Sequence, residues 1–242
     1  MVQKVFTEEE AQAIVDTLLE GNNLYLQERI DKRKSMEVSG GYAWTRPNHL
    51  DDRFAKADLP FVSSYKLKTA GESWQYLEFH SNNASKKTML IIKNRPRLEA
   101  TFERKGHRQS QYLVDCPAIN KEIAKQDKTV RAVEKIQLEL FGAEPDFGDI
   151  LVQEQFKEFE AFYVIVYEVD EFKHISSVEV VMPNPYTEIL EGIQDLTYCL
   201  EKTEIVQLES EELQQFPEEA PLLSEEYGYA SREQKEKKTN EE

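Results

Sequence analysis

Two carboxylates and a lysine stand in an order that could support metal-dependent chemistry. Asp146 follows a proline, and Glu171 and Lys173 stand two residues apart beyond an apolar run. In metal-dependent nucleases such a carboxylate pair holds Mg²⁺, while the lysine polarises the attacking water or stabilises negative charge. That chemistry needs Glu171 and Lys173 on a strand, but the sequence predicts a turn there, and short patterns of this kind often arise by chance. We therefore expect solvated turn charges, with a metal-dependent nuclease as an alternative.

A second candidate site is a cluster of positive charge in a very acidic chain. The 242 residues carry a formal net charge of −16, yet residues 86–108 hold eight Lys or Arg against two Glu. Such a cluster could hold phosphates by charge and by forked Arg hydrogen bonds, with Trp74 or Tyr112 stacking on an unpaired base. The candidate nucleic-acid or phosphate-binding residues are Lys93, Arg95, Arg97, Arg104 and Arg108.

The same positive charges have a simpler use inside the molecule. Residues 138–171 hold ten acidic residues and one lysine. Ion pairs between these two segments would neutralise the basic cluster, although each exposed pair contributes only about 0–1 kcal/mol. We favour this intramolecular use over a binding site for phosphate or for an acidic partner.

The other reactive residue types form no recognisable site. The four histidines are scattered, and Cys116 and Cys199 stand far apart, so we expect reduced core thiols and neither a disulfide nor a zinc site. Glycine-rich nucleotide loops and nucleophile motifs are missing from the sequence. The sequence therefore predicts no metal and no cofactor, and it favours a non-enzymatic protein over an enzyme.

The elements that would position these residues mix helices with antiparallel strands. Thr7 and Glu10 form the signature of a helix capping box. We expect helices at residues 8–19, with a continuation at 22–30, and at 96–105, 112–125 and 129–141, while residues 31–41 should form a loop. We expect strands at residues 61–68, 74–80, 88–93, 161–169 and 177–182, and a short amphipathic segment from 187 to 201.

This order of elements predicts an α+β fold. Because strands and helices do not alternate regularly, we expect an antiparallel sheet built from two hairpins and packed with several helices. Residues 1–200 should form a single globular domain, with a subdivision near 142–150 left open. Residues 201–242 hold 13 acidic and 5 basic residues and should form an acidic, largely disordered tail. The sequence contains no basic-then-apolar leader and no long apolar run, which predicts a cytoplasmic protein.

One part of the chain resembles a known family. The succession "GGYAW", "SWQYLEF", "MLIIKNRPR" and "YLVDCPAIN", within residues 40–120, resembles an uncharacterised family of proteins from Gram-positive bacteria and their phages. That family has no assigned activity. The resemblance therefore implies a bacterial or phage origin and assigns no functional residue.

These observations favour a non-enzymatic cytoplasmic binding or regulatory protein. It would be an antitoxin-like, immunity or phage–host conflict component whose acidic surface engages a basic protein. The net charge of −16 repels bulk nucleic acid and anionic membrane, so we expect a protein partner and no membrane. The alternatives are a single-stranded nucleic-acid-binding protein that uses residues 86–108, and the metal-dependent nuclease.

Overall fold

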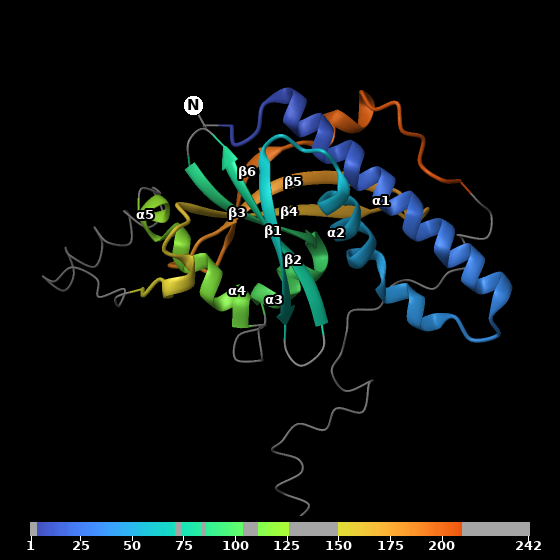
Figure 1. Cartoon of the computed structure of the whole chain (residues 1–242), viewed down its shortest axis with the longest axis horizontal. Coiled ribbons are helices and arrows are strands. Elements are labelled where there is room, and N and C mark those ends of the chain that lie inside the picture. The colour runs from blue at the N-terminus through green and yellow to red at the C-terminus, as the bar shows by residue number, and fades with distance from the viewer. Residues whose placement is uncertain (1–3, 71–73, 84–85, 104–110, 126–149, 210–242) are drawn as a thin grey trace, which may run out of the picture.

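The computed structural model describes residues 4–70, 74–83, 86–103, 111–125 and 150–209 (Figure 1). The helices are α1 (Glu8–Ser35), α2 (Arg46–Lys56), α3 (Arg95–Glu103), α4 (Gln111–Asp115) and α5 (Lys121–Ala124). Short 3-10 helices are η1 (Gly40–Trp44), η2 (Cys116–Asn120), η3 (Glu154–Phe156) and η4 (Thr197–Glu201). The strands are β1 (Val62–Ala70), β2 (Trp74–Asn83), β3 (Lys86–Asn94), β4 (Ala161–Val169), β5 (Ile175–Pro183) and β6 (Leu190–Asp195).

The six strands form one sheet in sequence order, β1-β2-β3-β4-β5-β6. Neighbouring strands are antiparallel except for β3 and β4, which run parallel from Thr88–Ala161 to Asn94–Tyr167. Parallel neighbours need a long crossover, which the 66 residues between β3 and β4 supply. The α+β prediction is confirmed, with a mostly antiparallel sheet, but the two antiparallel units meet at a parallel pair that the sequence did not reveal.

Helix α1 is the longest element and begins as predicted. The Thr7 hydroxyl accepts the Glu10 N–H at 3.2 Å, and the Glu10 carboxylate accepts the Thr7 N–H at 2.8 Å, which completes the capping box. The helix continues through Gly21 and ends at Ser35, so it replaces part of the predicted loop. A Cβ on Gly21 would lie 3.1–3.2 Å from atoms of His49 and Leu50, so glycine lets α1 and α2 pack closely.

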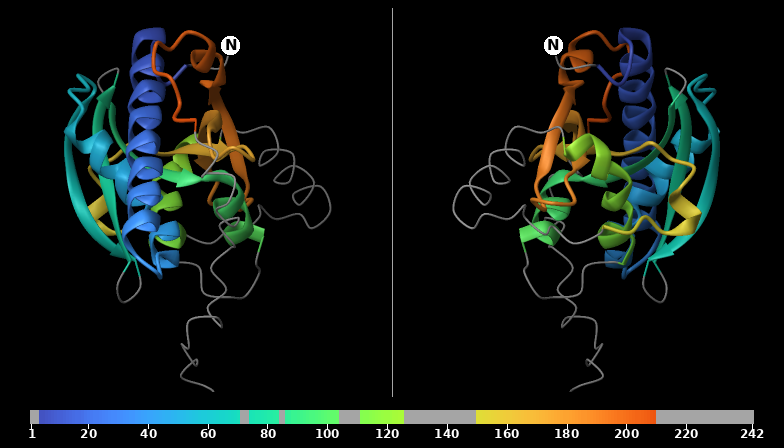
Figure 2. Two further views of the ribbon diagram at one scale, coloured as in Figure 1. Left: turned by 90° about the vertical axis from the view of Figure 1, so that its right-hand side faces the viewer. Right: turned by 90° about the vertical axis from the view of Figure 1, so that its left-hand side faces the viewer.

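Helices cover both faces of the sheet and create two cores. On one face, α1 and α2 pack over a cluster that includes Leu18, Phe54, Phe79 and Ile165. On the other face, α3, α4 and η2 pack over a cluster that includes Met89 and Phe162. The sheet curves, so that β1 and β2 lie on one side of α1 and β5 and β6 on the other (Figure 2).

Asn120 of η2 forms hydrogen bonds between the layer of α3, α4 and η2 and the sheet. Its amide group donates to the carbonyl oxygens of Phe162 and Pro183 at 2.9 and 3.0 Å, and its amide oxygen accepts the Phe162 N–H at 2.8 Å. Because Asn120 is fully buried, these bonds satisfy backbone groups that water cannot reach.

Several elements differ from the sequence-based expectations. The predicted strands are all present, but helix α2 was not predicted. The predicted helix over residues 112–125 is divided into α4, η2 and α5, because Pro117 lacks the N–H that a continuous helix needs. The predicted amphipathic segment over residues 187–201 contains strand β6 followed by η4. The predicted helix over residues 129–141 lies outside the described residues.

The chain after η4 packs along α1 within the predicted tail. Asn23 donates to the Val206 carbonyl oxygen at 2.8 Å and accepts the Leu208 N–H at 2.9 Å. The Gln207 side chain bonds to both the N–H and the carbonyl oxygen of Ile175, at 2.7 and 3.1 Å. Residues 202–209 are therefore part of the packed structure, and the predicted disorder of residues 210–242 concerns a segment outside the described residues.

Candidate functional site

The residues of the nuclease-like pattern lie in a tight turn where they are described. Glu171 and Lys173 fall between β4 and β5, in a turn held by the Asp170 carboxylate, which accepts the N–H groups of Phe172 and His174 at 2.9 Å. Lys173 has a φ of 68°, and its carbonyl oxygen accepts a hydrogen bond from Asn22 at 3.1 Å. Asp146 lies outside the described residues, within which no group of three potential metal-binding His, Cys, Asp or Glu side chains occurs.

Arg95 occupies the centre of an internal ion-pair network. Its guanidinium group contacts Glu99 at 3.1 Å, Glu168 at 3.4 Å and Glu179 of β5. Lys87 pairs with Glu158 at 3.0 Å. Two of these acids, Glu158 and Glu168, come from the acidic run 138–171, as expected for intramolecular pairing.

Lys93 and Arg97, two further cations of the predicted binding segment, lie over aromatic rings. The Lys93 ammonium lies 4.9 Å from the ring centre of Tyr76 and 5.4 Å from that of Tyr112, and these two rings stack at 4.4 Å. The Arg97 guanidinium lies 5.2 Å from the ring centre of Trp44. The Lys93 contact thus occupies the ring of Tyr112, one of the two rings predicted to stack on a base. Arg104 and Arg108 lie outside the described residues.

The interval between β2 and β3 holds a buried carboxylate that sequence reasoning missed. The pairing of β2 with β3 runs from Asn83–Lys86 only to Phe79–Leu90. Beyond that point Asp51 of α2 accepts the Leu77 N–H at 2.9 Å. Burial raises the pKa of Asp51 from 3.8 to about 6, although the Lys93 charge and the Leu77 N–H both act to lower this pKa. Asp51 thus accepts a hydrogen bond that a neighbouring strand would otherwise accept from Leu77. When ionised, it places a negative charge in a buried position.

Hydrogen bonds connect three further side chains of β1 and β2, those of Ser64, His80 and Glu78. Ser64 lies 3.2 Å from Nδ1 of His80, and Nε2 of His80 lies 2.9 Å from Glu78. The order of hydroxyl, imidazole and carboxylate resembles that of an activated nucleophile. However, Ser64 and His80 are direct cross-strand partners, and Glu78 stands two residues from His80 on the same face. Strand pairing alone therefore brings these side chains together, and we interpret these hydrogen bonds as structural.

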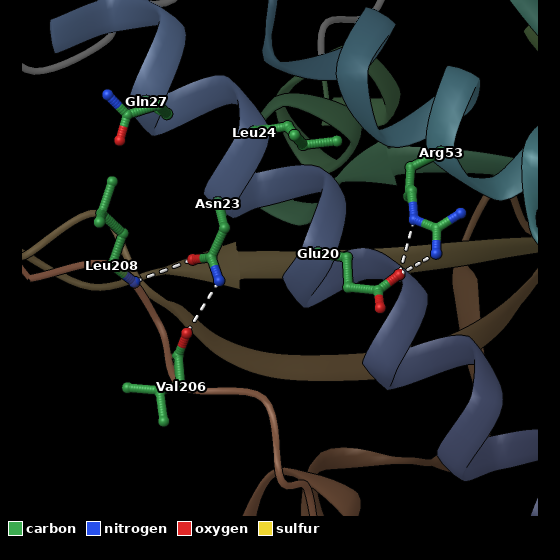
Figure 3. A pocket seen from close by; sticks show the side chains of 7 residues that line it. All are labelled: Glu20, Asn23, Leu24, Gln27, Arg53, Val206 and Leu208. Atoms are coloured by element: carbon green, nitrogen blue, oxygen red, sulfur yellow. Dashed lines mark hydrogen bonds and ion pairs between the residues drawn. The ribbon is translucent and has the colours of Figure 1, made fainter.

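The outer face of α1 carries an open hollow of about 510 Å³ (Figure 3). Its lining residues are Glu20, Asn23, Leu24, Gln27, Arg53, Val206 and Leu208. Arg53 donates to Glu20 from Nε at 2.6 Å, and Asn23 holds the chain at Val206 and Leu208. Leu24 and Val206 remain 53% and 82% exposed, so two apolar side chains border this hollow without being covered.

A second hollow of about 470 Å³ lies nearer the start of α1. Glu8, Glu9 and Asp16 line it, together with Lys202 from the segment that follows η4. We call the two hollows together the α1 groove, because both are lined by residues of α1 and by residues of the segment 198–208. The α1 groove combines exposed apolar side chains with an excess of carboxylates.

Comparison with protein-family models, with curated proteins and with solved structures finds no match for this chain. The resemblance to a family of Gram-positive bacterial and phage proteins therefore stays a prediction. Among the described residues, no helix combines the length and the apolar character needed to cross a membrane.

Proposed function

We propose that this chain is a non-enzymatic cytoplasmic binding or regulatory protein that engages a basic protein partner through the α1 groove. The observation that carries the proposal is that exposed Leu24 and Val206 line one of two hollows along α1, and Glu8, Glu9 and Asp16 line the other. Protein interfaces take most of their affinity from a few well-packed residues, whereas surrounding charges speed association and select the partner. The fitting partner segment therefore carries apolar side chains flanked by Lys or Arg.

The groove has the rigidity that a recognition surface needs. Asn23 fixes the backbone of residues 206–208, and Thr203 donates to Asp16 at 2.6 Å. These bonds hold the outer wall against α1 before any partner arrives. Preorganisation of this kind reduces the entropy lost on binding.

A peptide selection tests the proposal. The full chain is immobilised and panned against a random-peptide library displayed on phage, with a Leu24→Asp and Val206→Asp double variant as counter-selection. We expect selected peptides to combine Lys or Arg with apolar residues. Their affinity for the double variant, measured by fluorescence anisotropy, should fall about 30-fold, as for the loss of one interface hot spot.

The matched control is Leu151→Asp, which places the same charge at an 81% exposed leucine outside the groove. This variant should bind the peptides like the unchanged chain, and Glu8→Gln with Glu9→Gln should weaken binding mainly at low salt. Peptides without basic residues, or equal loss of affinity in the control, would contradict the proposal.

A further inference from the structure

Strand β1 forms one edge of the sheet, and its pairing with β2 is regular from Ser64 to Ala70. Residues 63–67 are exposed in succession, and Tyr65 and Leu67, which share one face, are 51% and 61% exposed. In an edge strand, half of the backbone N–H and C=O groups point away from the sheet and can pair with a further strand. The outer edge of β1 is therefore a surface to which an extended chain can be added.

The opposite edge of the sheet already has a contact of this kind. The Gln194 side chain of β6 accepts the N–H groups of Val5 and Phe6 at 2.9 Å and donates to the Phe6 carbonyl oxygen at 2.9 Å. Gln194 thus binds the segment that precedes α1 in the manner of a strand partner. The part of the chain that the structure describes makes no comparable hydrogen bond to the outer edge of β1.

The charge on β1 indicates what kind of strand fits it. β1 contains Lys66 and Lys68 and no acidic residue, and neither lysine forms an ion pair within the described residues. The cross-strand partner of Lys66 is Glu78, but this buried carboxylate bonds to a histidine of β2 at 2.9 Å. The pKa of Glu158 is lowered chiefly by its hydrogen bond to Lys87 and, to a smaller extent, by the charge of Lys66. The nearby carboxylates are thus held by other side chains, and the two lysines on β1 keep their charge for a partner.

We propose that β1 binds an extended, acidic segment of another protein as an added strand. A strand that alternates Glu or Asp with Val, Ile or Leu places carboxylates opposite Lys66 and Lys68 on one face. On the other face it places apolar side chains opposite Tyr65 and Leu67. Opposite charges and apolar pairs are the favourable cross-strand combinations. In binding of this kind the main-chain hydrogen bonds supply affinity and the alternating side chains supply specificity.

The same lysines disfavour a second copy of this chain as the added strand. The antiparallel registers that pair Leu67 with Tyr65 or with Leu67 of a second copy place lysines directly opposite each other, and like charges there are destabilising. The net charge of −16 does not prevent binding of an acidic segment. At about 0.15 M salt the Debye length is about 8 Å, so distant charges are screened, whereas side chains about 5 Å apart on paired strands still interact.

Hydrogen–deuterium exchange of the full chain tests the strand addition, with the amides of residues 62–70 as the readout. The probe is a synthetic peptide that alternates Val and Glu over about eight residues, within the usual length of a strand. We expect this peptide to slow exchange of the outward-facing amides of β1 several-fold. A peptide that alternates Val and Lys should have no effect. The Val–Glu peptide methylated at every backbone nitrogen keeps its charges but cannot donate to β1, so it should have no effect either.

Two double variants test the role of the lysines. Lys66→Glu with Lys68→Glu should reverse the preference, so that the Val–Lys peptide slows exchange and the Val–Glu peptide does not. Lys66→Gln with Lys68→Gln removes the charges without adding new ones, and it should weaken binding of the Val–Glu peptide about 2- to 30-fold, as for the loss of two cross-strand charge pairs. The matched control is Lys34→Glu with Lys125→Glu, which makes the same change of net charge at exposed positions outside β1. This control should bind the Val–Glu peptide like the unchanged chain.

Several results would overturn the inference. No slowing by the Val–Glu peptide, equal slowing by the Val–Lys peptide, or an equal loss of binding in the control excludes an acidic strand selected by β1. Slowing by the methylated peptide excludes strand addition. Slow exchange without any peptide shows that the edge is already occupied, by a second copy if exchange depends on protein concentration and by another segment of the chain if it does not. These measurements do not involve the α1 groove, so this inference and the proposed function succeed or fail separately.

Discussion

Asp51→Asn gives the sharpest test of the buried carboxylate between β2 and β3. The folded chain keeps Asp51 protonated up to a pKa of about 6, whereas the ordinary value is 3.8. Between these pH values the folded state binds more protons than the unfolded state, so stability falls as pH rises from about 4 to about 6 and then levels off. The shift corresponds to about 3 kcal/mol, at 1.36 kcal/mol per pKa unit. Asparagine keeps an oxygen for the Leu77 N–H but cannot ionise.

Urea unfolding of the two proteins at a series of pH values between 4 and 8 measures this effect. The stability of Asp51→Asn relative to the unchanged chain should rise by about 2.4 kcal/mol from pH 4 to pH 7, because the unfolded chain already has more than half of its Asp51 ionised at pH 4. Any fixed cost of burying the amide group cancels in that difference. Asp52→Asn is the control, because this exposed neighbour on α2 pairs with Lys56 at 2.7 Å. Parallel pH profiles for Asp51→Asn and the unchanged chain would refute the reasoning.

Three further substitutions or reactions test other contacts. Asn120→Ala should lower the free energy of unfolding by about 3 kcal/mol in urea titrations, because it leaves buried groups of Phe162 and Pro183 without partners; an effect below about 1 kcal/mol would contradict this. Arg95→Ala should lower the free energy of unfolding by about 1–3 kcal/mol in the same assay, because it leaves three partly buried carboxylates close together. An unchanged free energy of unfolding would argue against a stabilising ion-pair network. Burial raises the pKa of Cys116 to about 12, so its thiol should react with a disulfide reagent at pH 8 only after unfolding, and fast labelling of the native chain would contradict this.

Local patterns were sufficient to predict much of the fold. The aromatic and β-branched run of residues 161–169 identifies β4, and Thr7 with Glu10 identifies the start of α1. The signal for α2 was also present, since Pro47 stands in the first turn and Leu50 and Phe54 follow at helical spacing. Most of the other residues of α2 are polar or charged, so its apolar stripe is short and the helical pattern is weak.

Other features depend on contacts that no local pattern contains. β6 is a six-residue strand that includes Gly192, and it forms because β5 offers an edge beside it. The contact of Asp51 with Leu77 joins residues 26 positions apart and depends on where the β2–β3 pairing ends. The parallel arrangement of β3 and β4 follows from the path of the intervening crossover. Tertiary packing determines β6, the Asp51–Leu77 contact and the parallel β3–β4 pair, so these features could not be predicted from local sequence patterns.

The position of the acidic residues shows why charge density alone is a poor guide to a binding surface. Residues 138–171, with ten acidic residues and one lysine, would offer a surface to a basic partner if none of these charges were paired. Within this segment, Glu158 and Glu168 are already paired with Lys87 and Arg95. A carboxylate that already lies beside a cation attracts a second one less strongly, because the first cation neutralises much of its charge. Among the acids that border the α1 groove, Glu20 is likewise paired with Arg53, whereas Glu8 lies 3.7 Å from Lys4 with the two side chains 65% and 63% exposed, and Asp16 accepts hydrogen bonds from the neutral side chains of Gln12 and Thr203. Pairing within the fold, more than the number of acids in a segment, decides which charges can recognise another molecule.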